Sequence, residues 1–173
     1  SESLLIDLLD SELLNNPNLN ASINIKIDKI DKFEYLRDFV SKIHLGDGRI
    51  LMKNFNTQWN NSVLIESNEI EFINDIDGKK LVGEIIFNFE DIEKFFRYFQ
   101  IKRNYRDVFE TIKLDFVYDL TLDKLIMNNL RIDNESSKKI DKFLNQYNKS
   151  ELNSFNKVTI RNFIKDFFLV YAG

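Results

Sequence analysis

Apolar and polar residues alternate along much of this chain, with the period of two that is typical of β-strands with one buried face. The alternation is cleanest from Leu19 to Asp28, where Leu, Ala and Ile alternate with Asn, Ser, Lys and Asp. It returns from Leu81 to Phe89 and from Ile112 to Leu120. Together with shorter runs, the pattern predicts strands at 19–28, 40–45, 49–55, 62–67, 69–74, 81–89, 112–120 and 125–133.

Short connections indicate how these strands pair. The segments Gly46–Gly48 and Asp75–Gly78 carry the Gly and Asp residues of tight turns, and Leu120–Lys124 joins the last two predicted strands. Parallel strands need a long crossover connection, so connections this short predict antiparallel neighbours.

Other stretches repeat their apolar residues every three or four positions, which is typical of amphipathic helices. Phe95, Phe96 and Phe99 have this spacing directly after a predicted strand, and so do the Leu residues between positions 3 and 15. This first helix is predicted to end before Pro17, because proline disfavours helical backbone at the residue before it. The pattern predicts helices at 3–15, 90–99 and 136–147, a last helix ending near 171, and a short helix at 30–39, where the spacing is ambiguous.

The predicted fold is α+β, with a curved, mainly antiparallel β-sheet, short edge helices and helices at both ends. We expect a single domain over residues 1–173, with an N-terminal helix at 3–15, a sheet with an inserted helix at 19–133 and C-terminal helices at 136–171. Helices at the two ends would cover sheet edges that otherwise invite pairing with another strand.

The composition narrows the class of function. The 24 basic and 28 acidic residues give a net charge of −4, whereas nucleic-acid binding calls for a basic patch, so no nucleic-acid partner is expected. The absence of Cys excludes disulfides and thiolate chemistry. No apolar run is long enough to cross a bilayer as a helix, and the first ten residues lack the basic start of a signal peptide. We expect the chain to be a segment of a longer protein whose membrane anchor lies upstream.

Few residues are candidates for catalysis. His44 is the one histidine, and no Gly-x-Ser-x-Gly motif accompanies it. Asp115 and Asp119 lie on one face of a predicted strand and could pair for acid–base chemistry, but Lys113 shares that face, which favours a solvated charged surface. Asp75–Gly78 resembles a calcium loop only in part, since its register with Glu84 fails. We expect no enzymatic activity, cofactor or metal.

A small basic and aromatic cluster follows the central helix. Lys102, Arg103 and Arg106 surround Tyr105 there. Such a cluster could meet anionic lipid headgroups, or it could complement the dipole at the C-terminus of the helix, and the second interpretation is the simpler one.

The apolar face of the predicted sheet is the candidate binding surface. Aromatic stripes at Phe95–Phe99 and Phe163–Phe168 accompany it. One interpretation is ordinary core packing. The other is a groove for acyl chains, whose lining must be apolar and free of reactive groups. In that second case, the residues predicted to contact lipid are Ile85, Phe87, Phe89, Leu114, Phe116 and Tyr118.

Several segments resemble one family. They are Phe-Gln-Ile-Lys-Arg-Asn-Tyr-Arg at 99–106, Leu-Asp-Phe-Val-Tyr-Asp at 114–119, Asn-Leu-Arg-Ile-Asp at 129–133, the ending from 155 to 168, and 19–30. Together they resemble the C-terminal part of AsmA-like proteins from AT-rich marine alphaproteobacteria. The shared features are strand and helix texture and not catalytic motifs, so no site residue carries over by position.

The resemblance implies a function. AsmA-like proteins are anchored in the inner membrane and extend into the periplasm, where β-rich grooves are implicated in moving phospholipids toward the outer membrane. The chain is therefore expected to be a non-enzymatic periplasmic module with an apolar groove, whose partners are phospholipid acyl chains and other envelope proteins. The alternative is a structural or protein-interaction domain with a filled core and no ligand.

Overall fold

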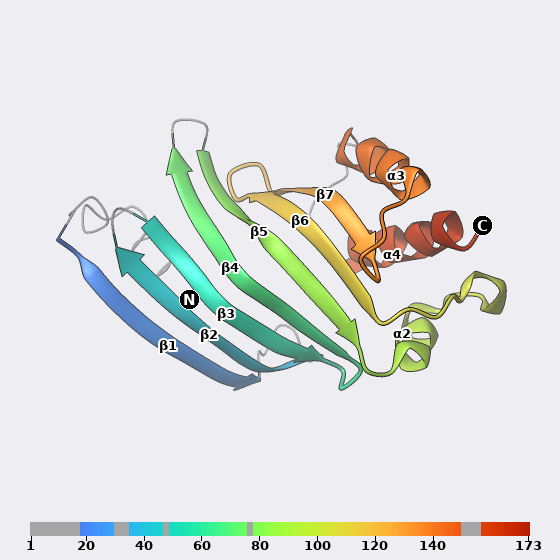
Figure 1. Cartoon of the computed structure of the whole chain (residues 1–173), viewed down its shortest axis with the longest axis horizontal. Coiled ribbons are helices and arrows are strands. Elements are labelled where there is room, and N and C mark those ends of the chain that lie inside the picture. Colours follow the sequence, from blue (N-terminus) through green and yellow to red (C-terminus); the bar gives the residue numbers. More distant parts are fainter. Residues whose placement is uncertain (1–17, 30–34, 47–48, 76–77, 150–156) are drawn as a thin grey trace.

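A seven-stranded antiparallel sheet forms the body of the protein, and each strand pairs with the next one in the sequence (Figure 1). The computed structural model describes residues 18–29, 35–46, 49–75, 78–149 and 157–173. The strands are β1 (Asn20–Lys29), β2 (Leu36–Gly46), β3 (Arg49–Trp59), β4 (Val63–Asp75), β5 (Gly78–Phe89), β6 (Thr111–Asp119) and β7 (Lys124–Ile132). The helices are α2 (Ile92–Phe99), the 3-10 helix η2 (Arg103–Tyr105), α3 (Lys138–Lys149) and α4 (Lys157–Tyr171).

This architecture confirms the predicted fold class, a curved antiparallel sheet with helices. The predicted turns also join antiparallel partners, since Gly46 pairs with Arg49, Asp75 with Gly78 and Asp119 with Lys124. The predicted N-terminal helix at 3–15 lies outside the described residues. The last helix, α4, contributes to the core on one face of the sheet, and the helix next to the edge strand β7 is α3.

The prediction of a short helix at 30–39 is wrong for its described end, because residues from Leu36 onward belong to β2. The pairing of β2 with β3 shifts between Arg37 and Val40, and Asp38 has a positive φ of 53°. This bulge interrupts the alternation of apolar residues, so the local sequence does not show the period of a strand. Residues 30–34 lie outside the described part of the chain.

The two short strands predicted at 62–67 and 69–74 are one continuous strand, β4. Its pairing with β5 shifts between Glu66 and Ile70, where three residues of β4 lie opposite two of β5. The extra residue changes which positions face the core, from Val63 and Ile65 before the bulge to Ile70 and Phe72 after it. A strand that continues through such a bulge looks like two strands in the sequence.

Bulges also occur in β2, β3 and β7, and they account for much of the bending of the strands in Figure 1. Asp38, Asn54 and Asn129 lie at these register shifts with φ near +50°. Asn and Asp adopt this left-handed conformation more readily than other residues with a side chain. The sheet therefore owes part of its curvature to three short polar residues in strands.

Buried hydroxyl groups satisfy carbonyl groups beside the bulges. Ser41 Oγ donates to the carbonyl oxygen of Lys53 at 3.3 Å, Thr57 Oγ1 to that of Arg37 at 2.9 Å, and Ser67 Oγ to that of Glu69 at 3.3 Å. All three side chains are buried. Because an unpaired polar group in a protein interior is costly, these bonds allow bulges to form within a buried surface.

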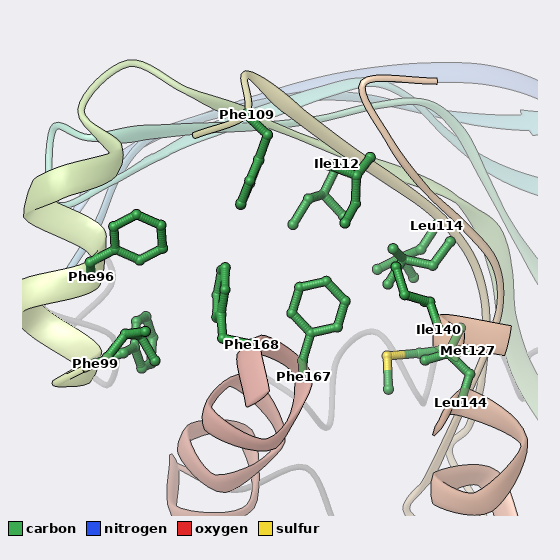
Figure 2. Packing of buried hydrophobic residues seen from close by; sticks show 13 residues of the cluster. Phe96, Phe99, Phe109, Ile112, Leu114, Met127, Ile140, Leu144, Phe167 and Phe168 are labelled. Atoms are coloured by element: carbon green, nitrogen blue, oxygen red, sulfur yellow. The ribbon is translucent and has the colours of Figure 1, made fainter. Parts of the chain in front are cut away.

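The register places apolar residues from every strand on one face. Directly paired residues in an antiparallel sheet share a face, so each row of partners can be followed across the sheet. The first row consists of Ala21, Leu45, Ile50, Phe72, Leu81, Tyr118 and Leu125. The second row consists of Ile23, Ile43, Met52, Ile70, Gly83, Phe116 and Met127. We call this the concave face, since the sheet bends toward it (Figure 2).

Gly83 is the one residue of the second row without a side chain, and the β4 bulge explains why. A Cβ atom at Gly83 would lie 2.9 Å from the carbonyl oxygen of Glu69, closer than ordinary packing allows. The glycine thus lets the backbone of β4 approach β5 where the sheet bends.

None of the described helices is long and apolar enough to cross a membrane.

The first prediction concerns the left-handed backbone at Asn54. Replacing Asn54 with Ala should lower the free energy of unfolding by about 1 kcal/mol, because a left-handed conformation costs a residue with a Cβ atom roughly 1–2 kcal/mol. Asn54→Gly should stay within about 0.5 kcal/mol of the parent, since glycine adopts this conformation freely. Urea denaturation would measure both values. Asn24→Ala, at an exposed β1 position outside the positive-φ set, is the control and should change little. Equal losses for all three variants would contradict the argument.

Candidate apolar binding site

Helices cover the concave face over β5, β6 and β7. Figure 2 shows the strands arching over a cluster of buried side chains, with α2, α3 and α4 around it. The buried members come from all three helices and from β6, β7 and their flanking loops: Phe96, Phe99, Ile101, Phe109, Ile112, Leu114, Met127, Leu130, Ile132, Ile140, Leu144, Phe167 and Phe168. A core built largely from aromatic and branched side chains therefore joins helices to sheet.

The sequence fixes α2 at both ends. Asp91 caps its N-terminus, where the carboxylate accepts a hydrogen bond of 2.8 Å from the backbone N–H of Lys94. Gln100 ends the helix in the left-handed conformation, with φ of 57°. Between the caps, the three-and-four spacing turns Phe96 and Phe99 into the core. The helix thus ends at Phe99, where the sequence predicted, and begins at Ile92, two residues later than the prediction of 90–99.

Aromatic contacts hold α4 in place. The Phe168 ring is stacked on Phe109, with centroids 5.9 Å apart, and meets Phe96 edge to face at 5.2 Å. Phe167 is stacked on Phe163 and on Tyr171 along the same helix. Such ring pairs add roughly 0.5–1.5 kcal/mol each beyond the area they bury. The two Phe168 pairs attach α4 to α2 and to the loop before β6.

A cavity of about 250 Å³ lies between α4 and the sheet. Its walls come from β5 to β7, from Phe95 of α2, from Tyr147 of α3 and from α4, and all but Tyr147 are apolar. They consist of Phe87, Phe89, Phe95, Ile112, Leu114, Leu125, Met127, Leu130, Tyr147, Ile160, Phe163, Ile164, Phe167 and Phe168. Burial raises the pKa of Tyr147 above its ordinary value, so the phenol stays neutral around neutral pH. The cavity thus carries no ionised side chain in its wall.

The residues predicted to contact lipid divide into three groups. Phe87, Phe89 and Leu114 line the cavity. Ile85 and Phe116 pack partly buried against the same core cluster but are not part of the cavity wall. Tyr118 lies at the end of β6, and its hydroxyl donates a 2.6 Å hydrogen bond to Asp123 in the β6–β7 turn.

Other cavity residues were missed, although part of the aromatic stripe of α4 was recognised as a potential lining. The missed set includes Met127 and Leu130 on β7, Tyr147 on α3, and Ile160 on α4. The bulge at Asn129 moves Leu130 onto the concave face, so a simple alternation from Leu125 does not find it. The approach of α3 and α4 to the sheet depends on contacts distant in sequence, for which no local signal exists.

A second apolar cluster lies on the concave face nearer to β1. Its buried members are Ile43, Leu45, Ile50 and Phe72. Leu19, Ala21, Ile25 and Leu81 pack against it, partly buried. The two rows of partners connect this cluster to the cavity, because Leu125 and Met127 end the rows on β7 and also line the cavity. The apolar surface is thus continuous across the sheet.

The candidate reactive residues have structural partners. His44 Nδ1 lies 3.3 Å from Ser22 Oγ across the β1–β2 pair, on the face opposite the apolar rows. Asp115 accepts a 2.7 Å hydrogen bond from Asn129 Nδ2. Asp119 accepts from the backbone N–H groups of the turn that follows it, at residues 121 and 122. Among the described residues, no group of three or more His, Cys, Asp or Glu side chains is arranged to hold a metal ion.

The basic cluster after α2 is split. Arg106 turns inward, donates through Nε to the carbonyl oxygen of Ile101 at 3.0 Å, and pairs with Glu93 at 3.0 Å. Its guanidinium also lies 5.8 Å from the centroid of the Phe96 ring. Arg106 therefore has a structural role, because it connects the loop after α2 to the helix and to its core. Of the three basic residues, Lys102 and Arg103 are left exposed at the surface.

Comparison of the chain with protein-family models, with curated proteins and with solved structures finds no match.

The second prediction concerns the attachment of α4. Phe168→Ala should lower the free energy of unfolding by about 3–5 kcal/mol, because the side chain is 1% exposed and its removal leaves a hole between α4, α2 and Phe109. Leu169→Ala is the matched control on the next position of the same helix, where the side chain is 45% exposed. Its loss should stay below about 1 kcal/mol. Chemical denaturation followed by circular dichroism would compare them, and similar losses would show that α4 is not held through Phe168.

Proposed function

We propose that this chain is a non-enzymatic module that binds the acyl chain of a phospholipid. The observation that carries the proposal is the apolar cavity under α4 together with the apolar concave face that continues from it. Sites for apolar ligands are concave, largely preformed and lined by hydrophobic and aromatic side chains. An acyl chain suits such a cavity, because its hydrocarbon tail has no polar atoms that would need hydrogen bonds from the walls.

The volume of the cavity limits what it can hold. At about 250 Å³ it exceeds the roughly 150 Å³ of an engineered apolar cavity that binds benzene, and it is smaller than the roughly 300–1,000 Å³ of a pocket for a drug-sized ligand. Part of one acyl chain fits. In the proposal, the end of one chain enters beneath α4, and the remainder of the lipid lies along the concave face.

The cellular setting is part of the proposal and rests on the resemblance to AsmA-like proteins. In this setting the chain belongs to a longer protein tethered to the inner membrane, works in the periplasm, and supports phospholipid transport or assembly of the outer membrane. Phospholipids and other envelope proteins are then its partners.

One observation favours the alternative of a structural or protein-interaction domain. Aromatic rings pack closely around α2: Phe95 and Phe99 meet each other and Trp59 of β3 at 4.7–5.5 Å between centroids, and Phe96 meets Phe168 of α4 at 5.2 Å. A core packed in this way needs no ligand for its stability. The alternative therefore predicts protein without lipid, and a variant that fills the cavity would be more stable and otherwise unchanged.

The third prediction separates these functions by filling the cavity. Ile164→Trp places a larger side chain at the wall of α4 and should weaken binding of a fluorescent fatty acid at least tenfold, without unfolding the protein. Fluorescence titration would measure binding, thermal denaturation would measure stability, and mass spectrometry of organic extracts would show whether purified protein carries phospholipid.

Leu169→Trp is the matched control, because this residue lies on the same helix, is 45% exposed and does not line the cavity. It should bind the fatty acid like the parent. Parent protein that contains no lipid and does not bind the fatty acid would overturn the proposal and leave the filled-core alternative.

A further inference from the structure

The two edges of the sheet are finished in different ways. On β7, the Asn148 side chain occupies the outer edge: Met127 N–H donates to Asn148 Oδ1 at 3.0 Å, and Asn148 Nδ2 donates to the carbonyl oxygen of Met127 at 2.8 Å. An isolated antiparallel bridge joins Ile132 to Glu135, and α3 packs alongside β7. These contacts satisfy edge groups that another strand would need, so β7 is closed to strand addition.

The β1 edge lacks such protection within the part of the chain that the structure describes. β1 is ten residues long, contains no proline, and pairs only with β2 in the described sheet. A long edge strand with unpaired backbone donors and acceptors is a template for another strand.

Exposed isoleucines mark the same strand. Ile23 is 48% exposed and Ile27 is 40% exposed, whereas Ile25 between them is partly buried. All three lie on the concave face, since they pair with Ile43, Phe39 and Ser41 of β2. The apolar face thus reaches the edge of the sheet with two large side chains uncovered on either side of Ile25.

We propose that the β1 strands of two copies of this chain pair antiparallel about a two-fold axis at Ile25. In this register Ile25 lies opposite its own counterpart, and Ile23 lies opposite Ile27 of the second copy, twice. The two exposed isoleucines of each copy then cover those of the other on the same face. Asn24 lies opposite Lys26, and Ser22 opposite Asp28, so no like charges lie directly opposite each other.

Neighbouring registers are less favourable. A shift that changes the parity of the pairing places every Ile of one copy opposite polar residues and on the wrong face. A register centred on Lys26 places the two Lys26 side chains opposite each other and pairs Ile23 with Lys29. Like charges directly opposite in a sheet are destabilising. The register centred on Ile25 alone pairs all the isoleucines of β1 with one another.

The pairing stops at two copies, because only the β1 edge of each copy can accept another strand. Once both β1 edges are used, the outer strands of the joined sheet are the two β7 strands, which Asn148 and α3 protect. A symmetric contact of this kind gives dimers and not fibres. The two concave faces become continuous, with one cavity at each far end.

The fourth prediction uses single-cysteine variants, which are clean because the chain has no Cys of its own. Under mild oxidation, Ile25→Cys should form a disulfide-linked dimer, since directly opposite Cα atoms lie about 4.5–5.5 Å apart, within disulfide range. Ile23→Cys is the matched control on the same face. Its two copies would lie about 13 Å apart along the strands, too far for a bond.

Asn24→Cys and Lys26→Cys report the neighbouring registers, and cross-linking of either in preference to Ile25→Cys would overturn the proposed register. Sedimentation equilibrium of the unmodified chain should show a dimer that forms as concentration rises. Ile25→Lys should weaken this association at least tenfold while the circular dichroism spectrum stays the same. An unmodified chain that remains monomeric at the highest concentration, with no cross-link at Ile25→Cys, would refute the dimer. That result would leave the proposed lipid binding untouched, because Ile164→Trp and its control test the cavity separately.

Discussion

The cross-strand register is the constraint on which the rest of this structure depends. A shift of one residue in any strand would turn its apolar side chains to the opposite face and break the rows that run from β1 to β7. The register holds through bulges because small polar residues support them: Asn54 and Asp38 adopt left-handed backbone, Ser41 and Ser67 satisfy carbonyl groups, and Gly83 makes room. The polar residues within the strands therefore preserve the apolar face and bend it.

Curvature also explains why the cavity forms where it does. A straight helix packed against a bent sheet cannot contact the sheet equally along its length. α4 makes ring contacts with both neighbouring helices, through Phe163 with Phe143 and Tyr147 of α3 and through Phe168 with Phe96 of α2 and Phe109. The side of α4 that faces the sheet lines the cavity. The aromatic contacts thus hold the helix to α2 and α3, while a cavity remains between the helix and the sheet. The packing of α4 and the cavity beneath it therefore both follow from placing a straight helix against a bent sheet.

The sequence predicted those features that local patterns control. Strands β1, β5 and β6 contain no bulge of their own, and α2 carries its own caps, so their existence and their apolar faces were recognisable. The errors lie at bulges, where one extra residue changes the parity of the alternation, as in β4 and at the start of β2. For the candidate site, Phe87 and Leu114 were found because they follow a regular strand, whereas Tyr147 and Leu130 depend on a distant helix and a bulge.

The two ends of the apolar face show how the same physical problem is handled twice. Apolar surface exposed to water costs free energy roughly in proportion to its area, so a face that spans seven strands must be covered. At the β7 end, helices cover it and the Asn148 amide closes the edge. At the β1 end, Ile23 and Ile27 remain exposed within the described structure, beside an edge that can still form hydrogen bonds. Apolar exposure and backbone hydrogen-bonding capacity coincide on one strand, and an added β-strand satisfies both at once, whereas a bound lipid would satisfy only the first.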